Sequence, residues 1–371
     1  MSAMWSIPVV MVVVLLFSNI AQASTCRKPR PDEVKGVYLW AKAAENPATL
    51  NRFIKLAETT EINAFVIDAN ETGNFLQEHN RRILARLAKH CIYAIARVVV
   101  FKADASWYAK TGDPASLQGG TLFLHDVRGR LWRDAIGNPW LNPFDHMVRK
   151  VMIEQAEYAA EMGFDEIQFD YVRFPTDAHP DQPISAINYN SHRLNAGLKT
   201  EAITDFVREA RKRLSLKKVR VSLDVFGEAA VIGSKPDPAG IGQDVQTLLH
   251  HLDIVSPMVY PRGFAKNRFG CEIPAQCPYK VVRASLTPLV RYQREHHRRV
   301  VVRPWIQDFT ANNWGTDIRV PYGPEEVREQ LRALKDLGIK TWMLWNSPRS
   351  GPQTYSTSAL RPRLPAVAQE K

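Results

Sequence analysis

The segment 166-EIQFDYVRFP-175 decides the fold assignment, because it has the composition of a buried strand and carries a single Asp, Asp170. Its apolar and aromatic residues favour a β-strand, and an ionised carboxylate is costly in such a run unless it is paired or used in chemistry. The same pattern recurs around Asp68 (FVIDAN) and Asp224 (SLDVFG). One acid at a strand end is more often a helix cap or an ion-pair partner. Three in one chain indicate an active site at the mouth of a barrel.

Strand-like and helix-like segments alternate from Lys35 onward. Several of the strand-like segments are nearly continuous apolar runs, which is typical of strands buried on both faces. The predicted strands are Gly36–Trp40, Ala64–Ala69, Tyr93–Phe101, Glu166–Phe174, Arg220–Phe226, Asp253–Tyr260, Val300–Asp308 and Thr341–Asn346. The predicted helices include Pro47–Glu58, His146–Met162, Thr200–Leu214 and Pro324–Leu337. This order favours an α/β fold of the (β/α)8 TIM-barrel type over a doubly wound sheet.

The N-terminus differs from the rest of the chain. Residues 1–23 hold an apolar core, Ile7–Phe17, and end in Ala21-Gln22-Ala23, which predicts a secretory signal peptide cut after Ala23. An uncleaved membrane anchor is the alternative, because no Lys or Arg precedes the apolar core. We expect no stable membrane insertion once the signal is removed. The prediction is therefore a secreted or periplasmic protein.

The rest of the chain is predicted to be one barrel domain, residues 24–352, with a poorly ordered tail at 353–371. Two long connections, residues 102–142 and 176–198, follow the third and fourth predicted strands. Barrel enzymes build their sites from the loops at the C-terminal ends of the strands. These two long loops are therefore expected to border the site.

The four cysteines all follow the predicted cleavage site, which suits an oxidising compartment. Cys271 and Cys277 frame a short, turn-rich loop, and their pairing leaves Cys26 for Cys91. Four cysteines allow three connectivities, so the other pairings stay open. The spacing does not match a zinc site.

The formal net charge is +11, and the signal segment contributes none of it. Lys and Arg are spread over predicted helical faces and the C-terminal tail. This pattern fits a basic surface on a secreted protein, and a preference for an anionic polymer is the sharper interpretation. No nucleic-acid-binding motif and no nucleotide-binding glycine motif is present, so neither nucleic acid nor a cofactor is expected.

Asp170 and Asp224 end the fourth and fifth predicted strands. Glycoside hydrolysis needs two carboxyl groups about 5 to 10 Å apart, one as acid and one as nucleophile or base. Neighbouring strands lie about 4.8 Å apart, so acids at equal height face one another in this range. We predict Asp170 as the nucleophile and Asp224 as the acid/base, with a pKa raised by burial and by the neighbouring carboxylate. An inverting mechanism with the same pair stays open.

Aromatic and polar residues recur at the other predicted strand ends, and such residues suit a sugar-binding rim. Aromatic faces stack on pyranose rings, and amides and carboxylates hold hydroxyl groups. Arg173 has the opposite parity from Asp170, so it points away from the barrel interior unless the strand has already ended. The predicted substrate-binding residues are Tyr38, Trp40, Asp68, Glu71, Arg97, Gln168, Arg173, Glu228, Tyr260, Trp305, Gln307, Asp308, Trp345 and Asn346.

Several segments resemble one bacterial family, which is described as a putative glycosyl hydrolase domain. They are KGVYLW, INAFVIDANE, IARVVVFKAD, GFDEIQFDYVRFP, SLDVFG, SPMVYP and RPWIQDF, and the resemblance runs from about Lys35 to Pro348. It implies a (β/α)8 fold and glycosidase chemistry, with Asp170 and Asp224 at the matching positions. It does not supply a substrate.

Together these features favour an exported glycoside hydrolase that acts on a bacterial poly- or oligosaccharide. The basic charge balance favours an anionic substrate within this class. A catalytically inert carbohydrate-binding barrel is the first alternative. A metal-dependent hydrolase is the second, with ligands from His125, Asp126, His146, His179 and Asp181. No helical HxxxH pair accompanies these residues, so no metal is expected.

Overall fold

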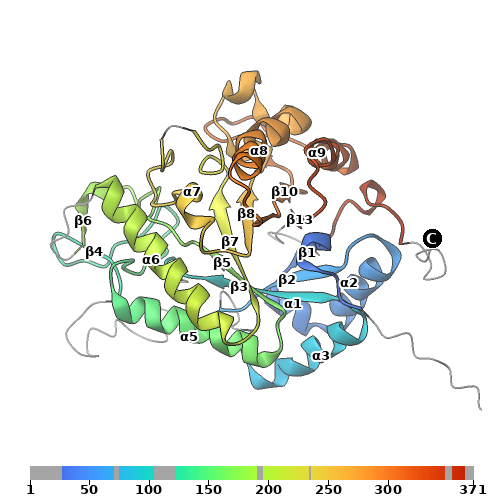
Figure 1. Cartoon of the computed structure of the whole chain (residues 1–371). Coiled ribbons are helices and arrows are strands. Elements are labelled where there is room, and N and C mark those ends of the chain that lie inside the picture. Colours follow the sequence, from blue (N-terminus) through green and yellow to red (C-terminus); the bar gives the residue numbers. More distant parts are fainter. Residues whose placement is uncertain are drawn as a thin grey trace, which may run out of the picture.

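The computed structural model describes residues 27–70, 75–103, 122–189, 195–233, 235–346 and 353–363. A closed parallel barrel forms its centre (Figure 1). The barrel strands are β1 (Lys35–Leu39), β2 (Ala64–Asp68), β3 (Tyr93–Val99), β5 (Glu166–Asp170), β7 (Arg220–Phe226), β8 (Ile254–Met258), β9 (Val301–Val302), β10 (Trp305–Gln307) and β13 (Trp342–Trp345). The predicted (β/α)8 barrel is confirmed.

The seventh predicted strand is split into β9 and β10. Both halves pair with β8, and β10 also pairs with β13, which pairs with β1 and closes the barrel. Pro304 lies between the halves and has no N–H to donate to a neighbouring strand. The predicted continuous strand is corrected in this respect, and the barrel still closes.

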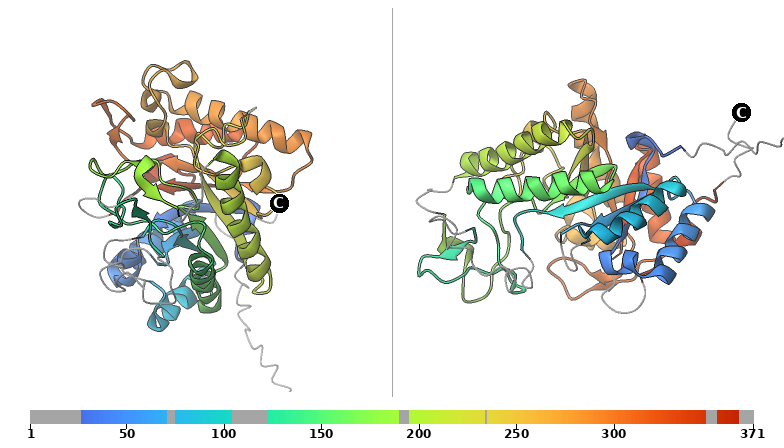
Figure 2. Two further views of the ribbon diagram at one scale, coloured as in Figure 1. Left: turned by 90° about the vertical axis from the view of Figure 1, so that its left-hand side faces the viewer. Right: turned by 90° about the horizontal axis from the view of Figure 1, so that it is seen from below.

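Helices surround the barrel on its outside (Figures 1 and 2). They are α1 (Ala41–Glu45), α2 (Pro47–Thr59), α3 (Arg81–Lys89), α5 (His146–Met162), α6 (Ala196–Ser215), α7 (Val245–Leu248), α8 (Pro278–Glu295) and α9 (Pro324–Asp336). Their ends follow local chemistry. The Asp145 side chain accepts from the first backbone N–H groups of α5, and Gly163, with φ of 108°, ends that helix.

The long connections after β3 and β5 pack against each other. A short antiparallel pair joins them, β4 (His125–Asp126) with β6 (Ile187–Asn188), and the indole N–H of Trp132 donates to the carbonyl of Gln182 at 2.9 Å. These loops extend beyond the barrel at one side (Figure 2, right). The prediction of long loops after the third and fourth barrel strands is confirmed.

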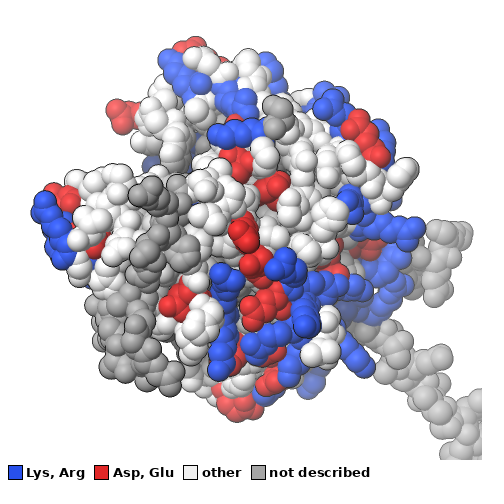
Figure 3. All heavy atoms as spheres, turned by 60° about the vertical axis from the view of Figure 1, so that its left-hand side comes forward, with Lys and Arg blue, Asp and Glu red and all other residues white. Residues whose placement is uncertain are grey.

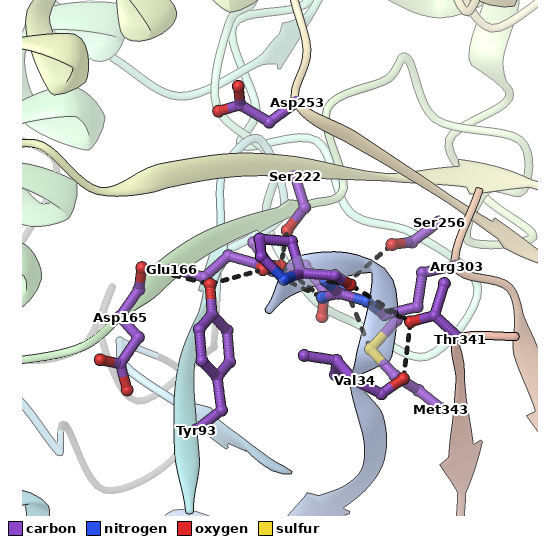
Figure 4. A network of polar contacts seen from close by, with 12 residues as sticks. Val34, Tyr93, Asp165, Glu166, Ser222, Asp253, Ser256, Arg303, Thr341 and Met343 are labelled. Carbon is purple, nitrogen blue, oxygen red and sulfur yellow. Dashed lines mark hydrogen bonds and ion pairs between the residues drawn. The ribbon is translucent and has the colours of Figure 1, made fainter. Parts of the chain in front are cut away.

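A fully buried ion pair fills the N-terminal end of the barrel (Figure 4). Arg303 Nη1 donates to both oxygens of Glu166, at 2.8 and 3.0 Å. Glu166 also accepts from the hydroxyl groups of Ser222 and Tyr93. Above this layer Gln168 donates to Ser256 at 3.1 Å. Every charge in the lowest layer is therefore matched, as burial requires.

Residues 353–363 pack onto the barrel, although the sequence predicted a poorly ordered tail there. Gln353 Nε2 donates to the carbonyl of Tyr38 at 2.8 Å, Leu360 is buried, and the Arg361 N–H donates to Glu61. These contacts join residues about 300 positions apart, which local composition cannot reveal. Residues 364–371 lie outside the described residues.

Cys271 and Cys277 form the predicted disulfide, with their Cα atoms 6.5 Å apart. Cys91 is also disulfide-bonded. Its predicted partner, Cys26, lies outside the described residues, as does the predicted signal peptide, residues 1–23. In the part of the chain that the structure describes, no helix is long and apolar enough to span a bilayer.

Basic side chains lie beside acidic ones on the face shown in Figure 3, where Lys and Arg gather in the lower half. On the helices this pairing is specific: Arg213 of α6 binds Glu157 of α5, and Lys217 binds Glu161 at 2.6 Å. Exposed pairs of this kind add little to stability. Neighbouring acids therefore neutralise part of the positive charge on this surface.

Candidate active site

A cavity of about 960 Å³ opens at the C-terminal end of the barrel. This is the end at which barrel enzymes carry their active sites. The cavity is lined by nine of the residues that the sequence singled out, namely Arg97, Asp170, Arg173, Asp224, Tyr260, Trp305, Asp308, Trp345 and Asn346.

Asp170, the last residue of β5, is held by a chain of buried polar groups. Arg97 donates to Asp170 Oδ2 from Nε at 2.9 Å and from Nη2 at 2.7 Å. Arg97 Nη1 donates to Asp68 Oδ1 at 2.6 Å, and the Tyr38 hydroxyl donates to Asp68. Charge-assisted hydrogen bonds of this kind are short and directional. They fix the orientation of the Asp170 carboxylate at the cavity floor.

The backbone turns sharply immediately after Asp170. Tyr171 has φ of 54°, an uncommon conformation for a bulky residue, and its N–H donates to Asp170 Oδ1 at 2.6 Å. The predicted strand to Phe174 therefore ends at Asp170. Because the strand alternation stops here, Arg173 lines the cavity instead of pointing away from it.

Asp224 lies beside Asp170 on the neighbouring strand β7. The last registered pair between the two strands is Phe169 with Leu223, so the two acids occupy the next position on each. Burial raises the pKa of Asp224 well above its usual range, and the negative charge of Asp170 raises it further. Trp305 Nε1 donates to Asp224 Oδ1 at 2.8 Å and opposes this rise. Asp224 therefore holds a proton under conditions in which an ordinary carboxyl group is ionised.

Aromatic rings form one wall of the cavity. The Trp305 and Trp345 rings meet edge to face with centroids 5.4 Å apart, and Trp345 stacks on Tyr38 at 4.1 Å. The Arg97 guanidinium lies 5.2 Å from the centre of the Trp345 ring. Burial raises the pKa of the Tyr260 phenol, and the nearby charges of Asp224 and Asp170 raise it further. This wall has the polar and aromatic character of a sugar-binding surface.

The remaining predicted substrate-binding residues that the structure describes are not part of the cavity lining. Gln168 is buried in the middle of the barrel, and Gln307 is fully buried, accepting from the Arg262 N–H and donating to the Phe309 carbonyl. Parity in a strand sets the face of a residue but not its height in the barrel or its hydrogen-bond partners.

Four further predicted residues also have other positions. Asp68 accepts hydrogen bonds from Arg97 and from the Tyr38 hydroxyl, as described above, so both residues help to position Arg97. Glu228 forms an ion pair with Arg268 at 2.5 Å, and Trp40 lies next to Lys42 and is not part of the cavity lining. Glu71 lies outside the described residues.

The sequence prediction missed two segments that line the cavity. One is the hairpin of β11 (Ala311–Asn312) and β12 (Arg319–Val320), and the other is the C-terminal segment with Thr354, Tyr355 and Ser356. The Ser356 N–H and hydroxyl both donate to Asp308, at 2.7 and 2.6 Å. Burial raises the pKa of Asp308 to about 6. No periodicity or motif marks either segment in the sequence.

The histidines considered as metal ligands lie elsewhere. His125 and Asp126 belong to β4, where Asp126 accepts from Arg130 and from backbone N–H groups of its own turn. His179 Nδ1 accepts from the Asp181 N–H at 3.3 Å. Within the described ranges, no group of three His, Cys, Asp or Glu side chains is placed to hold a metal ion.

A barrel with two buried, interacting carboxylates at its C-terminal mouth has the architecture of a barrel glycosidase. The chain belongs to the family described as a putative glycosyl hydrolase domain, whose model matches residues 36–350. This membership identifies the protein as a glycosidase-type enzyme. A comparison with curated proteins gives no match.

Solved structures with a similar fold include three bacterial proteins. A hypothetical protein from Ruminiclostridium thermocellum is 29% identical over 51% of this chain and 97% of its own, with a TM-score of 0.41. The spore cortex-lytic enzyme SleL of Bacillus megaterium is 11% identical over 85% and 72%, with a TM-score of 0.47. The glycoside hydrolase domain of PelA from Pseudomonas aeruginosa is 13% identical over 84% and 94%, with a TM-score of 0.47. Similarities at this level add nothing to the assignment of a substrate.

Proposed function

We propose that this protein is an exported glycoside hydrolase that cleaves a bacterial poly- or oligosaccharide, with Asp170 and Asp224 as its catalytic pair. One observation carries the proposal. At the mouth of the barrel, a carboxylate paired with Arg97 lies beside a second carboxyl group whose pKa is raised by burial and by the first. Two carboxyl groups with different protonation states are what glycosidic cleavage requires.

The environments of the two acids support different roles for them. Asp170 accepts two hydrogen bonds from the Arg97 guanidinium, which hold its carboxylate in one orientation, and it acts as the nucleophile on the anomeric carbon. Asp224 keeps its proton and donates it to the leaving glycosidic oxygen. The resulting glycosyl ester on Asp170 is then hydrolysed by a water that gives a proton to the Asp224 carboxylate.

The strand register supports a retaining mechanism. Retaining enzymes hold their carboxyl groups about 5 to 5.5 Å apart, and inverting enzymes about 6.5 to 9.5 Å apart. Equivalent positions on adjacent strands are about 4.8 Å apart, and Asp170 and Asp224 occupy such positions on β5 and β7. The anomeric configuration of the first product, followed by NMR, tests this part of the proposal.

Export is part of the proposal. A disulfide between Cys271 and Cys277 and a second one at Cys91 are typical of proteins that fold in an oxidising compartment. Together with the predicted signal peptide at 1–23, this supports a secreted or periplasmic enzyme. Sequencing the N-terminus of the exported protein checks cleavage after Ala23.

The function is tested by incubating the purified mature chain, residues 24–371, with a panel of bacterial polysaccharides and peptidoglycan and measuring new reducing ends. The Asp170→Asn variant runs in parallel, so that a contaminating hydrolase is recognised. We expect cleavage by the wild type and none by the variant. Binding by both proteins without cleavage by either would identify a carbohydrate-binding barrel instead.

A further inference from the structure

Arg173 is a buried arginine that faces the cavity without an ion-pair partner. It is 8% exposed and lines the cavity beside Asp170. Its Nη1 donates to the carbonyl of Phe174 at 3.0 Å and to the hydroxyl of Thr176 at 3.4 Å. Among the described residues, no carboxylate lies within ion-pair distance of Arg173, and its Nε and Nη2 donate to no group.

The other two buried arginines of the barrel are different. Arg97 binds the carboxylates of Asp68 and Asp170, and Arg303 binds the carboxylate of Glu166. A buried guanidinium without a carboxylate is costly, since burial removes its hydration. Burial accordingly lowers the pKa of Arg173, although the acidic groups of Tyr171, Asp170, Asp177 and Asp134 partly offset this. Arg173 is therefore a buried positive charge at the cavity that no carboxylate of the described residues pairs.

Aromatic rings hold this charge in place. The guanidinium carbon of Arg173 lies 5.0 Å from the ring centres of Trp140 and Tyr171 and 5.1 Å from that of Phe226. Such cation–π contacts fix the plane of the guanidinium without neutralising its charge. The edge formed by Nε and Nη2 is thereby left for another partner.

The described residues do not seal this edge. Within the described residues, three side-chain nitrogen and oxygen atoms are buried and have no hydrogen-bond partner: Asn80 Oδ1, Gln168 Oε1 and Arg298 Nε. Nε and Nη2 of Arg173 are not among these atoms, and Arg173 is one of the residues that line the cavity. Two further arginines, Arg262 and Arg319, also line the cavity and add to its positive character.

We propose that Arg173 binds a carboxylate of the substrate, and that the glycan cleaved by this enzyme is therefore acidic, built with uronic-acid-type sugars. The inference rests on the proposed function and names its substrate class. The Nε–Nη2 edge of a guanidinium presents two parallel N–H groups, which match the two oxygens of a planar carboxylate. A neutral sugar has no group that matches this charge.

The test measures binding by calorimetry in the Asp170→Asn background, so that no substrate is consumed. The probes are oligomers of polygalacturonate, of alginate and of glucuronan, each beside the same oligomer with its carboxyl groups reduced to alcohols. For at least one of the three, we expect the acidic form to bind about 10- to 100-fold more tightly than its reduced form. Adding Arg173→Gln should remove this preference and change binding of the reduced form by less than about threefold.

Two controls separate recognition from folding and from net charge. Arg299→Gln removes one positive charge from an exposed position at the opposite end of the barrel, and it should leave the preference intact. Arg173→Lys keeps the charge but loses the two-pronged edge, and it should recover only part of the preference. Unchanged binding of the reduced oligomers shows that each variant is folded.

Each outcome decides the inference. Equal affinity for acidic and reduced oligomers, failure to bind any of them, or equal loss of both forms in Arg173→Gln would overturn it. A sulfated dextran oligomer that competes as well as the acidic oligomers would show a general anion site and overturn the carboxylate assignment. Hydrolysis assays with the unmodified enzyme decide the proposed function separately. Arg173-dependent binding without hydrolysis would support the recognition of an acidic glycan and contradict the proposed glycosidase activity.

Discussion

Strand β5 carries two acids on one face, Glu166 at its start and Asp170 at its end, and their surroundings differ. Both are buried, and both face an arginine, Arg303 and Arg97 respectively. Glu166 is sealed among Arg303, Ser222 and Tyr93. Asp170 borders the cavity and lies beside a second acid, Asp224.

The difference shows that position along a barrel strand decides what a buried carboxylate does. At the N-terminal end, all of its partners come from the protein, so the ion pair can only hold the strands together. At the C-terminal end, the carboxylate meets a cavity and a neighbouring acid, which is the setting for catalysis. On the proposed function, the same residue type therefore serves stability at one end of β5 and chemistry at the other.

Apart from loss of the nucleophile itself, the largest effect on turnover is expected from Asp224→Asn. The amide keeps the shape of the side chain and can still accept from Trp305, but it has no proton to give to the leaving group. We expect kcat to fall about 10²- to 10⁴-fold, with an unchanged melting temperature. Steady-state kinetics on the substrate found by the panel, with calorimetric melting as control, measures both quantities. A fall in kcat of less than tenfold would show that Asp224 is not the general acid.

The opposite pattern is expected from Glu166→Gln. The substitution leaves Arg303 buried without its carboxylate, which should lower the free energy of unfolding by about 3 to 5 kcal/mol. The specific activity of the folded fraction should stay within about threefold of the wild type. Urea unfolding measures the loss of stability. The matched control is Glu161→Gln, whose solvent-exposed pair with Lys217 should contribute little to the free energy of unfolding.

The cavity end also holds a carboxyl group that couples stability to pH. The pKa of Asp308 is raised from 3.8 to about 6 by burial, so the folded state binds this proton more tightly than the unfolded chain. The contribution of this proton to the free energy of unfolding is complete below about pH 4 and is lost as the pH rises through 6. The free energy of unfolding changes by about 2 to 3 kcal/mol over this range. Unfolding of the wild type and of Asp308→Asn between pH 3.5 and 7.5 measures this difference. A constant difference between the two proteins would contradict the assignment.

The smallest effect is expected from Trp305→Phe. The indole N–H lowers the pKa of Asp224 by donating to its carboxylate, and phenylalanine cannot donate. The pKa of Asp224 should therefore rise further, and the alkaline limb of the kcat/KM profile should move to higher pH. A limb that stays in place or moves down would mean that another group controls it. Melting temperatures of the two proteins check that the wall is intact.

Much of the fold could be predicted from the sequence, because the signals are local. Continuous apolar runs mark the barrel strands, and residues such as Asp145 and Gly163 mark the ends of helices. The order of the strands alone places Asp170 and Asp224 on neighbours, since consecutive strands of a barrel lie side by side. The candidate catalytic pair therefore follows from the order of the strands.

The rest of the site depends on features that are not local. The parity rule for Arg173 fails because Tyr171 takes a positive φ, and nothing in the sequence requires this conformation. Gln168 and Gln307 have the residue type of sugar ligands, but their hydrogen bonds lie inside the protein. The contact between Ser356 and Asp308 joins distant segments and becomes visible only in the folded chain.

The most direct test of the account compares Asp170→Asn with Glu166→Gln on one substrate, measuring kcat and the free energy of unfolding for both. The account predicts that Asp170→Asn loses turnover by at least about 10³-fold and keeps most of its stability, whereas Glu166→Gln keeps turnover and loses stability. Near-wild-type turnover in Asp170→Asn would contradict the account.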